Sequence, residues 1–151
     1  MKFRDFHAGQ IIDAGPYRVT EDDVVGFASR WDPQWFHTDP ARAAHGPFGG
    51  LIASGMHTLA IAMHLLVPVA LVGSESYASP GLAYVKWPNP VHVGDALRLH
   101  VEVLEVRCSQ KRPTLGIVRW RWQLFNQRDE KTLETEATSL FDLTTSGAPD
   151  S

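Results

Sequence analysis

The chain has 151 residues, of which 44% are hydrophobic, and its formal net charge at pH 7 is -3. This length suits one compact domain with its own hydrophobic core and is too short for two. The slight acidic excess gives no basic surface of the kind that binds a phosphate backbone, so we do not expect nucleic acid as a partner.

The cysteine count and the apolar segments indicate the compartment. A lone cysteine, Cys108, cannot form an internal disulfide, and residues 1–5 lack the apolar run of a signal peptide. The longest apolar stretch, 51–72, approaches the roughly twenty residues that cross a bilayer, but polar residues such as His57 interrupt it. We interpret it as a buried helix with a turn or kink at Pro68. A cytoplasmic protein that does not enter a membrane is therefore expected.

The first part of the chain predicts a strand followed by helices. Residues 9–19 have the pattern of a short strand. Thr20, with Asp23 three residues later, resembles a capping box that opens a helix. That helix places four apolar residues on one side: Val24, Phe27, Ala28 and Trp31. A second short helix is expected to begin with Asp39 as its N-cap and Pro40 at its first position.

From Tyr77 onward the hydrophobic period changes to two, as strands require. Four alternate residues of the first long strand share one face: Leu97, Leu99, Val101 and Val103. The next strand repeats the pattern with Val118, Trp120, Trp122 and Leu124. Residues 126–130 read as a hairpin loop before a last strand at 132–143. These strands predict an α+β domain over 1–143, with a curved antiparallel sheet around the long apolar helix, and a disordered polar tail at 144–151.

An acid and a histidine stand five residues apart in 32–40, a turn-prone segment expected to lie outside regular helix or strand. Such a loop can bring the side chains of Asp32 and His37 together as an acid/base pair. Taken alone the pair is a weak motif, because a capping aspartate and a surface histidine give the same pattern.

The surrounding residues, 27–56, resemble the signature of MaoC-like dehydratases and (R)-specific enoyl-CoA hydratases. In that signature a D-x-N-P-I/L-H motif precedes an acidic residue, an alanine-rich turn, a phenylalanine and an H-G-M at the start of the central helix. The matching elements are Asp32, His37, Asp39, Ala43, Ala44, Phe48, Ser54, Gly55 and Met56. A second family feature, an aromatic residue followed by P-V-x-x-G-D, is similar to residues 87–95.

The resemblance implies a single hot-dog fold and a hydro-lyase activity. Such enzymes reversibly hydrate a trans-2-enoyl-CoA or enoyl-ACP to an (R)-3-hydroxyacyl thioester. No metal or separate cofactor is implied, since coenzyme A or acyl carrier protein is part of the substrate. Related hot-dog enzymes join two sheets side by side, and an unpaired sheet edge is normally covered, so we expect a homodimer or higher homo-oligomer.

The reaction needs a base for water, a proton donor for the α-carbon and a donor to the thioester oxygen. We assign the first two roles to Asp32 and His37. The third fits the backbone N–H of Gly55, because a helix that begins near it presents unpaired donors and glycine leaves room for the ligand.

Four further residues are expected to bind substrate: Gln34, Trp35, Phe48 and Ser54. Three of them depart from the family pattern. Gln34 stands for asparagine, Trp35 for proline and Ser54 for histidine. The Trp35 indole would narrow the acyl pocket or simply pack in the core.

Two rival functions remain open. Many hot-dog thioesterases carry a carboxylate on the central helix, and residues 49–74 contain neither aspartate nor glutamate. A non-catalytic acyl-thioester binding subunit would keep the fold without using the pair. His57 and His64 are about 10 Å apart on the helix, too far for one metal, and are expected to pack.

Overall fold

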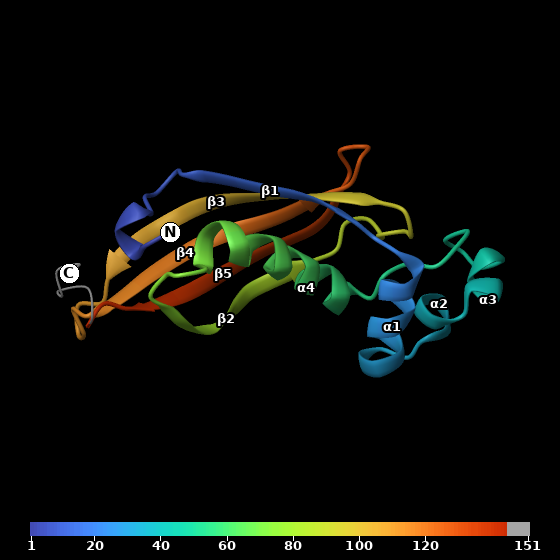
Figure 1. Cartoon of the computed structure of the whole chain (residues 1–151), viewed down its shortest axis with the longest axis horizontal. Coiled ribbons are helices and arrows are strands. Elements are labelled where there is room, and N and C mark those ends of the chain that lie inside the picture. The colour runs from blue at the N-terminus through green and yellow to red at the C-terminus, as the bar shows by residue number, and fades with distance from the viewer. Residues whose placement is uncertain (145–151) are drawn as a thin grey trace.

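The computed structural model describes residues 1–144, so most of the predicted tail at 144–151 lies outside the described residues. Its sheet has five antiparallel strands in the order β1-β3-β4-β5-β2. The strand bounds are Ile11–Arg18 for β1, Ser76–Lys86 for β2, Ala96–Cys108 for β3, Leu115–Phe125 for β4 and Lys131–Asp142 for β5. Figure 1 shows this sheet curving around the helix α4 (Gly55–Leu66), which confirms the predicted α+β hot-dog architecture.

The meander predicted from period-two alternation is confirmed for β3, β4 and β5. Pairs such as Val101 with Trp122 lie opposite each other across the strands, and both side chains are buried. The two edges arise from segments that precede the meander, because β1 pairs with β3 and β2 with β5. The apolar face that the alternation predicts is the face that packs against α4.

The central helix begins later than the apolar stretch that predicts it. Residues 51–54 are extended, because Ile52 forms a bridge with His92 and the Ala53 N–H donates to the Val91 carbonyl at 2.8 Å. At the other end, Pro68 lies in a π-helical turn, η2 (Val67–Leu71), as the predicted kink requires. Within residues 1–144 there is no helix both long and apolar enough to cross a membrane.

Helix α1 (Glu21–Trp31) begins at the predicted cap, where the Thr20 hydroxyl accepts from the Asp23 N–H at 3.2 Å. The Asp23 carboxylate does not complete a capping box, since it accepts from the Tyr17 hydroxyl at 2.6 Å. Of the four apolar residues expected on one side of this helix, Val24 and Ala28 are buried but Trp31 is not. Its side chain is 64% exposed beneath the Arg30 guanidinium, 4.9 Å from the ring centroid.

Two short helices follow α1. The prediction that 32–40 lacks helix is wrong, because Trp35–Thr38 forms one helical turn, α2. The predicted second helix is confirmed as α3 (Pro40–Ala44), in which the Asp39 side chain accepts from the Arg42 N–H at 3.1 Å. Figure 1 shows α1, α2 and α3 beyond one end of the sheet, beside the first turn of α4. This end of the molecule gathers the residues of the predicted site.

Removing the cap of α1 should lower stability. We expect Thr20→Ala to reduce the free energy of unfolding by about 1 kcal/mol, because one first-turn N–H loses its acceptor. Urea unfolding followed by tryptophan fluorescence measures the change. Thr114→Ala, at an exposed turn, is the matched control, and equal midpoints for both variants would contradict the capping role.

Candidate active site

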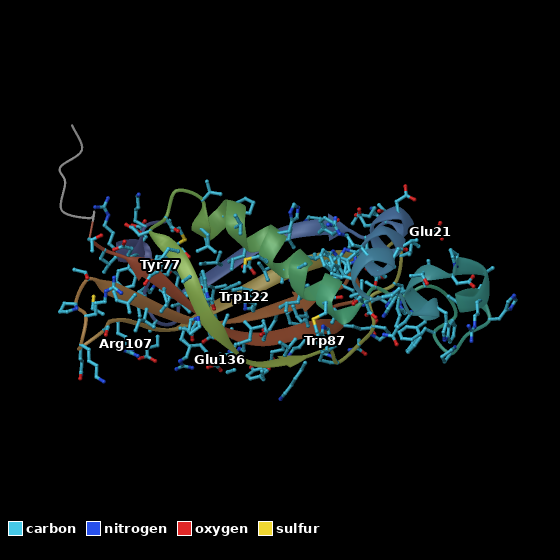
Figure 2. The ribbon with its side chains drawn as sticks, turned by 90° about the horizontal axis from the view of Figure 1, so that it is seen from below. Glu21, Tyr77, Trp87, Arg107, Trp122 and Glu136 are labelled. Atoms are coloured by element: carbon cyan, nitrogen blue, oxygen red, sulfur yellow. The ribbon has the colours of Figure 1, made fainter. Side chains whose placement is uncertain are left out.

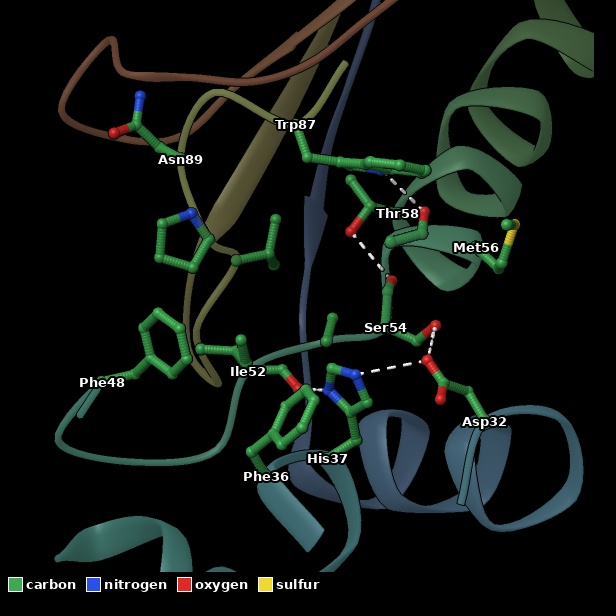
Figure 3. Close-up of a pocket in the computed structure, with 14 residues that line it drawn as sticks. Asp32, Phe36, His37, Phe48, Ile52, Ser54, Met56, Thr58, Trp87 and Asn89 are labelled. Carbon is green, nitrogen blue, oxygen red and sulfur yellow. Dashed lines mark hydrogen bonds and ion pairs between the residues drawn. The ribbon is translucent and has the colours of Figure 1, made fainter. Parts of the chain in front are cut away.

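A cavity of about 440 Å³ lies between α1, α2 and the first turn of α4 (Figure 3). Its size falls in the range of small-molecule sites, about 300–1,000 Å³. The lining residues come from the two predicted motifs and from the segment between them: Asp32, Phe36, His37, Phe48, Ile52, Ala53, Ser54, Gly55, Met56, Thr58, Trp87, Asn89, Pro90 and Val91.

The acid and the histidine of the first motif lie side by side in this cavity. Asp32 is the C-cap of α1, and His37 is on the single turn α2, so the chain reverses between them. The His37 Nε2 atom lies 3.3 Å from the Asp32 Oδ2 atom (Figure 3). The His37 side chain is buried and that of Asp32 is 24% exposed, so the carboxylate is the more accessible partner.

A backbone carbonyl fixes the orientation of the imidazole. The His37 Nδ1 atom lies 2.6 Å from the Ile52 carbonyl oxygen. A carbonyl oxygen only accepts, so Nδ1 carries the hydrogen of this bond. Nε2 is therefore the ring atom that faces Asp32 and can exchange a proton there. Sequence reasoning did not find Ile52, because a backbone acceptor has no signature in residue type.

The Asp32 carboxylate accepts a hydrogen bond at each oxygen. The Ser54 hydroxyl donates to Oδ2 at 2.7 Å, and the Gln34 side-chain amide donates to Oδ1 at 2.7 Å. These two bonds, that from Ser54 first, hold the pKa of Asp32 below its usual value because they favour the charged form. Two of the three positions that depart from the family pattern, Gln34 and Ser54, thus both donate to the carboxylate. Ser54 also lines the cavity, whereas Gln34 reaches the carboxylate from outside it.

The first turn of α4 forms one wall of the cavity. Ser54 is the N-cap, but its hydroxyl is directed to Asp32 and does not cap the helix. The amides of the first turn, starting with Gly55, have no partner within the helix and lie at its positive end. A negatively charged oxygen in the cavity would be stabilised there.

The reason for glycine at position 55 differs from the one expected. A Cβ atom built on Gly55 would lie 2.6 Å from Cε2 of Trp87, whose indole N–H also donates to the Gly55 carbonyl at 2.9 Å. The glycine therefore makes room for a side chain of this protein. The available sequence signal for Trp87 was its place as the aromatic residue of the second motif.

The remaining expected substrate contacts divide between the cavity and its surroundings. Phe48 lines the cavity and is 44% exposed. Trp35 packs elsewhere: its ring centroid lies 4.3 Å from the Arg42 guanidinium carbon, and the ring covers Gly46. Of the two alternatives for Trp35, packing agrees with this position, and Trp35 is not among the residues that line the cavity.

The two helical histidines of α4 pack as expected. His57 stacks on Phe27 of α1 with ring centroids 4.6 Å apart, and His64 meets the edge of Tyr17 at 5.5 Å. Burial lowers the pKa of His57, whose Nδ1 atom has no hydrogen-bond partner among the described residues. Nor do residues 1–144 contain a group of three side chains placed to hold a metal ion.

Comparison with known proteins agrees with this geometry. The family model of the MaoC-like domain matches residues 5–119, so the chain belongs to the MaoC-like domain family. A solved MaoC-like dehydratase from Rhodospirillum rubrum has a TM-score of 0.83 and 37% identity, over 92% of this chain and 94% of that one.

Two curated relatives define how far the similarity extends. The uncharacterized protein YdeM of Bacillus subtilis is 35% identical over 93% of this chain and 98% of its own length. The 3-hydroxyacyl-thioester dehydratase Z of Mycobacterium tuberculosis is 43% identical over 82 residues, which are 53% of this chain and 54% of that protein. The full-length similarity thus establishes the family, and the match to dehydratase Z covers about half of each chain.

Removing the Ser54 hydroxyl should raise the pKa of Asp32. We expect Ser54→Ala to move this pKa toward the usual aspartate value, because the charged form loses its strongest hydrogen bond. A ¹³C-detected NMR titration of the carboxyl measures it. Ser109→Ala, at the turn between β3 and β4, is the control. An Asp32 pKa equal in the two variants would show that the Ser54 bond does not hold the charge.

Buried His57 should make folding sensitive to acid. Because burial lowers its folded pKa, the unfolded chain binds a proton more readily, and stability falls as pH drops below about 6.5. We expect His57→Phe to lose less stability than the wild type between about pH 7.5 and about pH 5.5 in urea unfolding. His64→Phe is the control, since His64 is exposed. An unchanged pH dependence in His57→Phe would contradict this.

Proposed function

We propose that this protein is an acyl-thioester hydro-lyase that reversibly hydrates a trans-2-enoyl thioester to the (R)-3-hydroxyacyl thioester. The observation that carries the proposal is the 3.3 Å contact between His37 Nε2 and Asp32 Oδ2, in a cavity that also contains the first turn of α4. The family membership and the dehydratase name of the relative from Mycobacterium tuberculosis support it.

In the proposed reaction Asp32 acts as the base. His37 acts as the acid in its imidazolium form, which carries one hydrogen on Nδ1, bonded to the Ile52 carbonyl, and one on Nε2. Water gives a proton to the Asp32 carboxylate while its oxygen bonds to C3 of the enoyl group. The π electrons move toward C2, and C2 receives the proton of His37 Nε2. The proton on Asp32 then returns to His37 across their contact, which restores both groups. Each transfer requires hydrogen-bond reach, which the shared cavity allows.

The α4 N-terminus supplies the third requirement. Negative charge grows on the thioester oxygen during the addition, and the Gly55 N–H is the proposed donor to it. A preorganised donor of this kind typically contributes about 100- to 1000-fold in rate. Phe48 and Ser54 line the same cavity and are the proposed substrate contacts, while Gln34 acts through Asp32.

The proposed substrate brings its own carrier, either coenzyme A or acyl carrier protein. None of the proposed steps uses a metal or a nucleotide cofactor. We therefore expect hydration to proceed in the presence of a chelator.

Asp32→Asn and His37→Ala should each abolish hydration of crotonyl-CoA. Asparagine keeps the shape of aspartate but cannot accept the proton, and alanine removes the acid. The measurement is loss of absorbance of the conjugated thioester, with chiral analysis of the product. The double variant should be little worse than either single one, because the two groups act in one step.

Melting temperatures and an exposed variant, Asp129→Asn, control for folding in this experiment. Thiol release without hydration would transfer the assignment to a thioesterase. Stabilisation by acyl-CoAs with no turnover across a panel of enoyl chains would indicate a binding subunit instead.

We further propose that the protein works as a homodimer joined along β2. This strand pairs with β5 on one side only, and it carries the exposed apolar residues Tyr77 (54% exposed; Figure 2) and Leu82 (39%). Unpaired apolar edges are normally covered, and a second copy offers the same edge.

Sedimentation velocity at micromolar concentration should give a dimer. Leu82→Lys should shift the distribution toward the monomer, because a charge at the edge opposes pairing. Lys2→Glu, at the N-terminal segment, is a charge-change control. A wild-type monomer would contradict the proposal directly.

A further inference from the structure

A second cavity lies next to the active-site cavity. It has a volume of about 250 Å³ and is lined by Met56, Leu59, Ala60, Met63, Ser79, Leu82, Trp122, Ala137 and Ser139. Most of these side chains are apolar, as a hydrocarbon chain requires. Met56 belongs to the linings of both cavities, so the two are neighbours.

The two cavities follow one another along the same pair of elements. On α4, the active-site cavity uses the first turn from Gly55, and the second cavity continues to Met63. On the other side, the active-site cavity meets Trp87, just after the end of β2, and the second cavity meets Leu82 and Ser79 within the strand. The second cavity is therefore the continuation of the first along the space between α4 and β2.

The indole of Trp87 lines the active-site cavity and links its two walls. Trp87 follows the last residue of β2, and its ring reaches the first turn of α4 (Figure 3). Its N–H donates to the Gly55 carbonyl, and its ring occupies the place that a Cβ on Gly55 would take. Along the chain Trp87 comes after Leu82 of the second cavity and before Asn89 of the first, so on this side it is the active-site lining residue nearest in sequence to the second cavity. It is also 42% exposed, so little packing holds the ring on its outer side.

We propose that Trp87 determines acyl-chain length, by closing the active-site cavity on the side of the second cavity. With the indole in place, the site takes short enoyl chains. Without it, the two cavities join and admit longer chains. The inference rests on the proposed function, because it names the substrate class of that same site.

The expected gain follows from the apolar lining. Each buried methylene strengthens binding about fourfold, so two more methylenes in the second cavity correspond to roughly tenfold or somewhat more. The wild type should not show this gain in binding, because the indole keeps the acyl chain out of the second cavity. Trp87 also contacts Gly55, so the ratio between long and short chains is the readout, because a common effect on catalysis cancels in it.

The test compares Trp87→Ala with the wild type on enoyl-CoAs of four, six, eight and ten carbons. We expect the ratio of kcat/KM for the eight-carbon to the four-carbon substrate to rise at least about tenfold in Trp87→Ala. Trp87→Phe keeps an aromatic ring over Gly55 and should shift the ratio much less. In the Trp87→Ala background, Met63→Trp fills the second cavity and should reverse the gain.

Three outcomes would overturn the inference. The first is an unchanged ratio of kcat/KM between the eight-carbon and four-carbon substrates in Trp87→Ala. The second is a change in KM by the same factor for every chain length, which would place the carrier arm against the indole. The third is failure of Met63→Trp to reverse the gain. Thermal unfolding verifies that each variant is folded.

A binding measurement separates this inference from the proposed function. Affinities of saturated acyl-CoAs of the same four lengths, measured by calorimetry, need no turnover. If no variant hydrates any substrate but Trp87→Ala gains affinity for the longer chains, the proposed function fails and the role of Trp87 stands. If hydration occurs but Trp87→Ala changes the chain-length dependence of neither kcat/KM nor affinity, the proposed function stands and the role of Trp87 fails.

Discussion

The hydrogen bond from Ser54 to Asp32 connects the two helices on which the site depends. Asp32 ends α1 and Ser54 begins α4, so this 2.7 Å contact joins one helix C-terminus to one helix N-terminus. It also leaves the first turn of α4 without a side-chain cap, and Gly55 and Met56 of that turn line the cavity. One hydroxyl thus favours the charged carboxylate and keeps the opposite wall available for an anion.

Much of the fold could be predicted because its periodicities are local. Alternation along 97–103 and 118–124 defined two strands and their buried face, and Thr20 and Asp39 marked two helix starts. The start of α4 at Gly55 agrees with the start that the family signature implies. The extended pairing of 51–54 just before it could not be predicted, because its partner segment lies about forty residues away in the chain. The exposure of Trp31 could not be predicted either, because helical periodicity indicates which residues share a side and not how far packing extends along it.

The site was predictable to the extent that its chemistry lies in side-chain types. Asp32 and His37 came from one motif, and the structure places them together. The hydrogen bond to the Ile52 carbonyl could not be predicted, since every residue has a backbone carbonyl. The role of Gly55 was assigned to the ligand, whereas the structure assigns its lack of a side chain to Trp87, the aromatic residue of the other motif. Contacts between the two motifs form only when the chain folds, so neither motif alone predicts which residue of the other it contacts.

The bond between His37 and the Ile52 carbonyl also bears on how this site tolerates mutation. The acceptor belongs to the main chain, so replacing the Ile52 side chain leaves it in place. Its position depends on backbone pairing of 51–54 with Val91 and His92, inside the second motif. Backbone pairing therefore determines which imidazole nitrogen bonds to the carbonyl and which faces Asp32. A substitution at position 52 can change the shape of the cavity and still leave Nε2 free to exchange a proton with Asp32.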